Sequence, residues 1–88
     1  MTNIKPVPKS HITKMENSLV CLLWGRAAKA GYKTFEMAQI MGTTTATVRR
    51  RKLAPKEFTL EELYRLCVAL NIPFADVAEA MGGGKVAI

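Results

Sequence analysis

Apolar residues recur every three or four positions along most of the chain, which is the period of amphipathic α-helices. The first such stretch predicts a helix from about Thr13 to Ala30. Thr13 and Glu16 have the spacing of a capping box, so the helix is expected to begin there. Gly31, which readily adopts a positive φ angle, is expected to end it. The residues that recur at these steps and are predicted to share one largely apolar face are Leu19, Leu22, Leu23, Arg26 and Ala27.

Two shorter helices are predicted in the middle of the chain. The first covers Thr34 to Met41, with Thr34 as its N-cap and Gly42 as its stop. The second runs from Ala46 to Leu53, after three threonines that are suited to capping, and Val48 is its inward-facing residue. The residues predicted to share the inner face of the first of these helices are Met37, Ala38 and Met41.

The C-terminal third of the chain predicts two further helices. Thr59 and Glu62 form a second capping-box pattern ahead of an apolar stripe. The last amphipathic stretch runs from Phe74 to Met81, and Gly82 ends it. The members of the stripe are Leu60, Leu63, Leu66, Cys67 and Leu70.

Five short helices, short connections and the lack of a strand pattern predict one compact all-α domain. We expect this domain to cover residues 13–82. Residues 1–12, which contain Pro6 and Pro8, are expected to be a flexible basic arm, and residues 83–88 a short tail.

The composition is that of an ordinary small globular domain of 88 residues. The longest apolar run, Leu19 to Trp24, is far shorter than the roughly 20 residues that cross a bilayer. No secretory signal is recognisable, so we expect a soluble, cytoplasmic protein.

Few residues offer catalytic or metal-binding chemistry. Cys21 and Cys67 are far apart and His11 is the single histidine, so neither a disulfide framework nor a metal site is predicted. Both thiols are expected to be buried and reduced. No pair of acids and no nucleophile beside a base is visible, so neither catalysis nor a cofactor is expected.

The charges are strongly segregated along the chain. Residues 1–56 carry eleven Lys or Arg against Glu16 and Glu36, a net charge of +9. Residues 57–88 carry two basic residues against five acids, a net charge of −3, which together give the total of +6. A field with one positive side attracts polyanions and favours nucleic acid as a ligand, although a solvated basic surface would show the same charges.

The residues around Gly42 have the pattern of a helix-turn-helix unit. Ala38 provides a small side chain where the helices cross, Gly42 a permissive turn, and Val48 an apolar plug beneath the second helix. Two stretches, G-Y-K-T-F-E-M-A-Q-I-M-G-T-T-T-A-T-V at 31–48 and F-T-L-E-E-L-Y-R-L-C-V-A-L-N-I-P-F-A-D-V at 58–77, resemble the Cro/CI-type helix-turn-helix regulators, also called the XRE family. The resemblance spans about residues 14–81. It implies a sequence-specific DNA-binding regulator in a bacterial or phage setting, more often a repressor than an activator.

Helix geometry separates the basic residues of the predicted third helix. With Val48 facing inward and 100° per residue, Arg51 and Lys52 turn back toward the margin of the domain. The residues that point outward are Ala46, Arg49, Arg50 and Leu53. The positions that correspond to base-reading positions of the resembling family are Thr45, Ala46, Arg49 and Arg50. Arg50 is the first candidate for base readout, because a guanidinium can bridge guanine O6 and N7.

Phosphate contacts are expected near the start of the second helix, in the turn and after the third helix, where backbone amides, hydroxyls and ammonium groups can meet a DNA strand. The candidate residues are Lys33, Thr34, Thr43, Thr44 and Lys56. The arm with Lys5 and Lys9 either follows a groove or the phosphates, or is a solvated tail.

The third helix departs from the family pattern. Arg51 stands where the family usually keeps a bulky apolar residue, so part of the inner anchor is lost and Leu53 is expected to compensate. Ala27 and Lys52 stand where many relatives have an Arg and a Glu that pair. Because both partners are absent, no unpaired charge is left buried. Trp24 is expected to fill space in the core or at an interface.

The sequence therefore predicts a regulator that binds double-stranded DNA and acts by occupying an operator. A homodimer is expected, because two recognition helices one DNA turn apart match a palindromic site. Its contact would come from the first helix, the fifth helix or the tail Val86–Ile88. The alternative is a protein-binding module, such as an antirepressor or an antitoxin-like partner.

Overall fold

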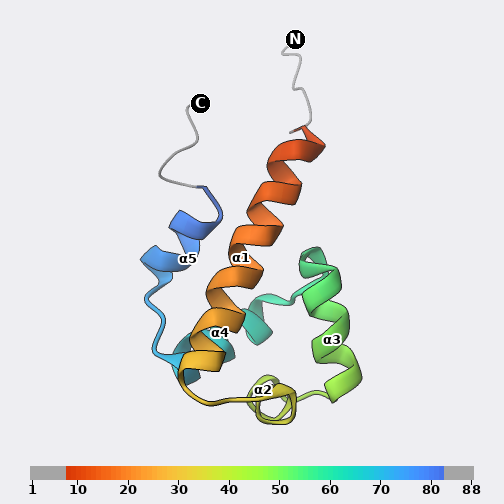
Figure 1. Cartoon of the computed structure of the whole chain (residues 1–88), viewed down its shortest axis with the longest axis vertical. Helices are drawn as coiled ribbons and strands as arrows, with labels where there is room; N and C mark the ends of the chain where they lie inside the picture. The colour runs from red at the N-terminus through yellow and green to blue at the C-terminus, as the bar shows by residue number, and fades with distance from the viewer. Residues whose placement is uncertain (1–7, 83–88) are drawn as a thin grey trace.

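The computed structural model describes residues 8–82, which form five α-helices and one short 3-10 helix (Figure 1). No strand occurs within this range, and the predicted all-α domain is confirmed. The elements in chain order are α1 (Lys9–Lys29), α2 (Thr34–Met41), α3 (Thr45–Leu53), η1 (Pro55–Glu57), α4 (Leu60–Leu70) and α5 (Phe74–Ala80). No helix in the described part is long and apolar enough to cross a membrane.

The hydrophobic core lies where the C-terminal half of α1 meets the other helices. α2 packs against both α3 and α4, and α5 lies beside α1 (Figure 1). Leu23 of α1 and Leu66 of α4 are fully buried, and Val48 of α3 is 1% exposed. Full burial of such a side chain contributes about 1.5–3 kcal/mol. The inward orientation predicted for Val48 is therefore confirmed, and α3 is fixed to the core at its midpoint.

Two helix boundaries agree closely with the sequence. The hydroxyl of Thr59 accepts a hydrogen bond from the Glu62 backbone N–H at 3.1 Å, and the Glu62 carboxylate accepts one from the Thr59 N–H at 3.0 Å. This is the predicted capping box of α4. Gly42 ends α2 with a φ angle of 71°, and a Cβ atom there would lie 2.8 Å from a guanidinium nitrogen of Arg65. The backbone conformation therefore favours glycine at this turn, whereas the Arg65 guanidinium is the end of a flexible side chain that can move aside.

Helix α1 begins four residues earlier than predicted. Pro8 occupies the N-cap position with ψ near 145°, and its carbonyl accepts hydrogen bonds from the His11 and Ile12 N–H groups at 3.0 and 3.3 Å. No residue between Lys9 and Ile12 breaks a helix, so the helix extends back to Pro8 and Thr13 lies inside it. Part of the predicted arm is thus helical. Residues 1–7, with Lys5, and the tail 83–88 lie outside the described residues.

Two burial predictions were wrong. Leu60 is 82% exposed, because it is the first residue of α4 and lies at the edge of the apolar stripe. Cys21 is exposed, because it is two residues from both Leu19 and Leu23 and so lies on the opposite face of α1. Cys67 is buried as predicted, and burial raises the pKa of its thiol, which keeps it protonated.

Candidate nucleic-acid interface

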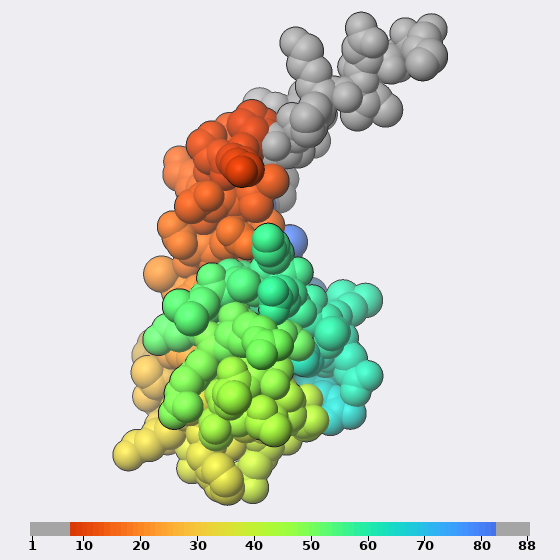
Figure 2. Space-filling model, turned by 90° about the vertical axis from the view of Figure 1, so that its right-hand side faces the viewer, coloured from red at the N-terminus to blue at the C-terminus, as the bar shows by residue number. Residues whose placement is uncertain are grey.

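α2 and α3 are joined by a tight turn on one side of the domain. The Thr43 N–H donates to the Ala38 carbonyl at 2.9 Å, which closes the end of α2. Thr44 is the N-cap of α3, and its hydroxyl accepts a hydrogen bond from the Thr47 N–H at 3.2 Å. Ala38 and Val48 are buried between the two helices. Seen from this side, α3 occupies the centre of the face and α2 is visible below it in the view (Figure 2).

The outer side of α3 presents most of the predicted base-reading residues to solvent. Ala46, Arg49 and Arg50 are exposed, and Thr45 is half-buried at the start of the helix. Neither Arg49 nor Arg50 forms an ion pair with any of residues 8–82. Both guanidinium groups can therefore meet an external acceptor without first breaking an internal contact.

Arg51 turns inward, as its position relative to Val48 predicted, and forms a bidentate ion pair with α4. Its Nε donates to Glu62 Oε1 at 2.9 Å and its Nη2 donates to Glu62 Oε2 at 3.3 Å. A weaker contact reaches Glu57 at 3.4 Å. The Arg51 and Glu62 side chains are 15% and 12% exposed, so most of this pair is shielded from water.

This pair replaces the apolar anchor that the sequence lacks at position 51. The prediction that Leu53 compensates was wrong, because Leu53 is the last residue of α3 and is 88% exposed. Glu62 was predicted only as a capping residue, and its second role was missed. The available signal was a single inward-facing arginine, which implies an acid on the facing helix.

The Glu62 carboxylate is held in its charged form. Burial by itself raises its pKa, but the hydrogen bonds from Arg51 and Thr59 outweigh burial, and the net result is a lowered pKa. The hydrogen bond to Glu62 likewise raises the pKa of Arg51. The Glu62 carboxylate thus caps the N-terminus of α4 and, at the same time, binds Arg51 of α3.

A contribution to acid sensitivity follows from this lowered pKa. Glu62 has a lower pKa in the folded chain than in the unfolded chain, so its stabilisation is complete above the unfolded pKa and is lost as pH falls through the folded pKa. We expect the parent to be more stable than Glu62→Gln at neutral pH, and this difference in the free energy of unfolding to shrink below about pH 5. Urea denaturation of both chains between neutral and acidic pH measures it. A difference that stayed constant with pH would contradict the assignment.

Lys52 and Trp24 lie at the margin of the interface. The Lys52 ammonium nitrogen is 5.8 Å from the centre of the Trp24 ring, and Trp24 meets Phe58 edge to face with ring centres 6.1 Å apart. Trp24 is half-buried against the core, in agreement with the packing role predicted for it. The Lys52 contact links the end of α3 to α1, and the Phe58 contact links the segment before α4 to α1.

The predicted phosphate contacts are distributed around α3. Lys33, Thr44 and Lys56 are exposed, whereas Thr34 and Thr43 are half-buried. Thr34 is the first residue of α2 and not its N-cap, because Lys33 occupies that position. The Lys33 N–H donates to the Glu36 carboxylate at 2.7 Å. The Thr44 hydroxyl, which caps α3, donates to the Thr47 hydroxyl oxygen at 3.1 Å. These two groups therefore offer fewer free donors than the sequence indicated.

Most acids of the C-terminal half are paired within the chain. Asp76 binds Arg26 at 2.9 Å, Glu61 binds Arg65 at 2.6 Å, and Glu57 and Glu62 bind Arg51. Arg49 and Arg50, which form no ion pair with the described residues, remain as the charge on the outer side of α3. Within residues 8–82, no group of three His, Cys, Asp or Glu side chains is placed to hold a metal ion.

A buried crossing, a glycine turn and a second helix with exposed arginines define a helix-turn-helix DNA-binding domain. Residues 23–81 match the family model of the Cro/C1-type HTH DNA-binding domain, and the chain belongs to this family. The match begins within α1 and includes α2 to α5. No curated protein and no solved structure gave a match. Family membership implies that DNA is the partner of this domain.

Proposed function

We propose that the chain is a sequence-specific regulator of transcription that binds duplex DNA and represses by occupying its operator. The observation that carries this proposal is the division of charge on α3. Arg49 and Arg50 are exposed and have no acidic partner among residues 8–82, whereas Arg51 is held by Glu62. The second helix of a helix-turn-helix unit enters the major groove, so the unpaired arginines would face base edges there.

The roles of individual residues follow from their chemistry. Arg50 would bridge O6 and N7 of a guanine, with Arg49 beside it, and Ala46 and the methyl group of Thr45 would pack on thymine methyl groups. Lys33 and Lys56, on either side of α3, would contact phosphates, with Thr34, Thr43 and Thr44 close to the same strand. The proposed function requires binding alone and involves no catalytic step and no cofactor.

The chain would act as a homodimer in the cytoplasm of a bacterial cell. One α3 helix reads only a few base pairs, whereas two helices one DNA turn apart read a site with two-fold symmetry. Such a dimer would block polymerase when its operator overlaps a promoter.

Selection of bound duplexes from a random pool tests the proposed function. We expect enrichment of one motif with two-fold symmetry. Affinity for the enriched duplex should fall with salt, with a slope of log affinity against log salt of about −0.9 for each phosphate contact. A pool that shows no enrichment, together with binding that does not depend on salt, would instead support a protein-binding module.

A further inference from the structure

The outer side of α4 carries a row of exposed apolar side chains. Leu60, Tyr64 and Val68 are spaced by four residues and are 82%, 55% and 63% exposed. Phe74, at the start of α5, is 58% exposed and stacks on Tyr64 with ring centres 6.0 Å apart. We call these four residues the α4 patch. Contiguous exposed apolar side chains, unlike single scattered ones, mark a candidate interaction site.

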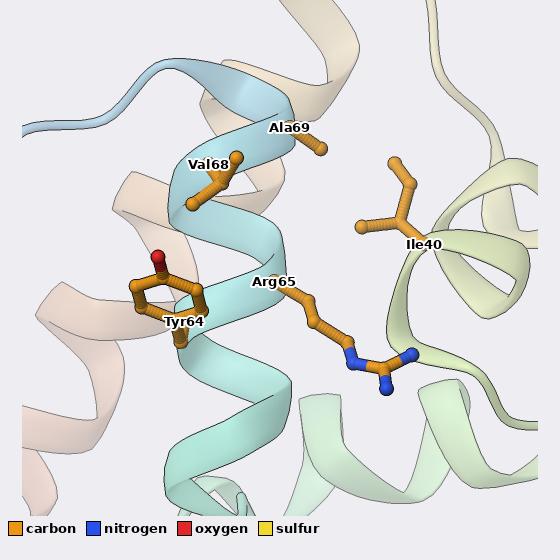
Figure 3. A pocket seen from close by; sticks show the side chains of 5 residues that line it. All are labelled: Ile40, Tyr64, Arg65, Val68 and Ala69. Atoms are coloured by element: carbon orange, nitrogen blue, oxygen red, sulfur yellow. The ribbon is translucent and has the colours of Figure 1, made fainter.

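A shallow hollow continues the α4 patch toward α2. Ile40 of α2 points across it toward α4, and Ala69 lies beside Val68 on the opposite wall (Figure 3). Tyr64 and Arg65 also line the hollow: Arg65 extends from α4 toward α2, and Tyr64 lies over the face of α4 beside it (Figure 3). The surface therefore has an apolar centre with a charged group on one flank.

The three residues of the α4 patch that lie on α4 itself are spaced symmetrically about Tyr64. Leu60 lies four residues before it and Val68 four residues after it, so all three project along one strip of the helix. If two α4 helices pack antiparallel across a two-fold axis at Tyr64, Leu60 of each copy faces Val68 of the other. Such a surface is complementary to itself, which is the property that an isologous dimer contact requires.

Charge complementarity also favours a second copy of the chain. At 100° per residue, Glu61 and Arg65 lie on the same flank of the α4 patch. They bind each other at 2.6 Å within one chain. Across the two-fold axis, Arg65 of one copy would lie close to Glu61 of the other, which joins the two pairs into a four-residue network. The nearby acids Glu62 and Asp76 are already paired with arginines, so little net charge opposes the approach.

The α4 patch can be covered without covering the DNA-binding side chains. Figure 2 shows α3 face on, and the residues of α4 lie at the side of this view. A partner on the outer side of α4 would therefore leave Arg49 and Arg50 accessible.

We propose that two copies of this chain associate through the α4 patch, with their α4 helices antiparallel across a two-fold axis at Tyr64. This inference rests on the proposed function, because it supplies the dimer contact that a symmetric operator requires. It places the contact on α4 with Phe74, rather than on α1 or the C-terminal tail.

The oligomeric state of the full chain without DNA tests the proposal. We expect sedimentation equilibrium to show a reversible dimer. Val68→Glu should weaken dimerisation at least about 10-fold, because a symmetric contact loses two apolar side chains and gains two charges. Phe35→Glu is the matched control, since Phe35 is 61% exposed on α2 and lies outside the α4 patch, and it should dimerise like the parent. A parent that stays monomeric, or a Val68→Glu chain that dimerises like the parent, would overturn the proposal.

Cross-linking tests the predicted geometry independently. In a Cys21→Ser background, Tyr64→Cys should form a disulfide-linked dimer on oxidation, because packed helices about 8–10 Å apart bring facing Cα atoms within disulfide reach. Phe35→Cys in the same background should not. Equal cross-linking of both variants would contradict an axis at Tyr64. If dimerisation fails these tests while the random pool still yields a specific motif, only the contact is wrong; a dimer without any motif would contradict the proposed function instead.

Discussion

Arg51→Met is expected to lower the free energy of unfolding by about 2 kcal/mol, or the melting temperature by about 10 °C. Methionine fills much of the same space, but it leaves the Glu62 carboxylate without its strongest partner in a site where that side chain is 12% exposed. Removal of one member of a shielded ion pair costs more than the pair itself contributes, because a desolvated charge remains. Thermal and urea denaturation measure the change.

Arg49→Met is the matched control for this prediction. It is the same substitution on the same helix at an exposed arginine that pairs with no acid in the described part of the chain, so its effect on stability should stay within about 0.5 kcal/mol. The double variant Arg51→Met with Glu62→Gln removes both charges and retains an oxygen that can cap α4. We expect it to be less destabilised than the sum of the two single variants by about 1 kcal/mol. Strict additivity would show that the ion pair does not couple α3 to α4.

Arg50→Ala is expected to reduce discrimination at one base pair of the selected operator by about 1–3 kcal/mol, roughly 5- to 150-fold. The side chain is exposed and makes no ion pair within the described residues, so its removal should leave the fold unchanged. Fluorescence anisotropy with the selected duplex and its single-base variants measures the loss, and circular dichroism confirms that the helices persist.

Lys56→Ala provides the comparison, because a phosphate contact carries no sequence information. It should weaken binding to all duplexes alike and make the salt slope shallower by about 0.9. If Arg50→Ala ranked the duplexes in the same order and with the same ratios as the parent, Arg50 would not read a base.

Much of the fold could be predicted because its determinants are local. The capping box of α4 needs only Thr59 and Glu62, and the turn after α2 needs only a residue that tolerates the φ angle of Gly42. Once Val48 is placed inward, the period of the helix places Arg49 and Arg50 outward. The predicted start of α1 was wrong because both Pro8 and Thr13 can begin a helix. Only the structure shows that the helix begins after Pro8.

The remaining features depend on how the helices pack. Arg51 and Glu62 are eleven residues apart, and their pairing requires the relative placement of α3 and α4, which no local pattern encodes. The exposure of Leu60 has the same origin, because a periodic stripe does not show where the neighbouring helices end. The base-contacting and phosphate-contacting residues stay predictions that the mutational series tests.

The double role of Glu62 has a practical consequence for changing which operator the protein recognises. A library that randomises the outer positions of α3 can sample new specificities while the domain stays folded, because those side chains make no ion pair within the described part of the chain. Position 51 should be kept constant in such a library. A substitution there would remove the contact that holds α3 and would also disturb the carboxylate that caps α4. Variants that carried it would differ in stability as well as in recognition, so selection would favour the better-folded ones first.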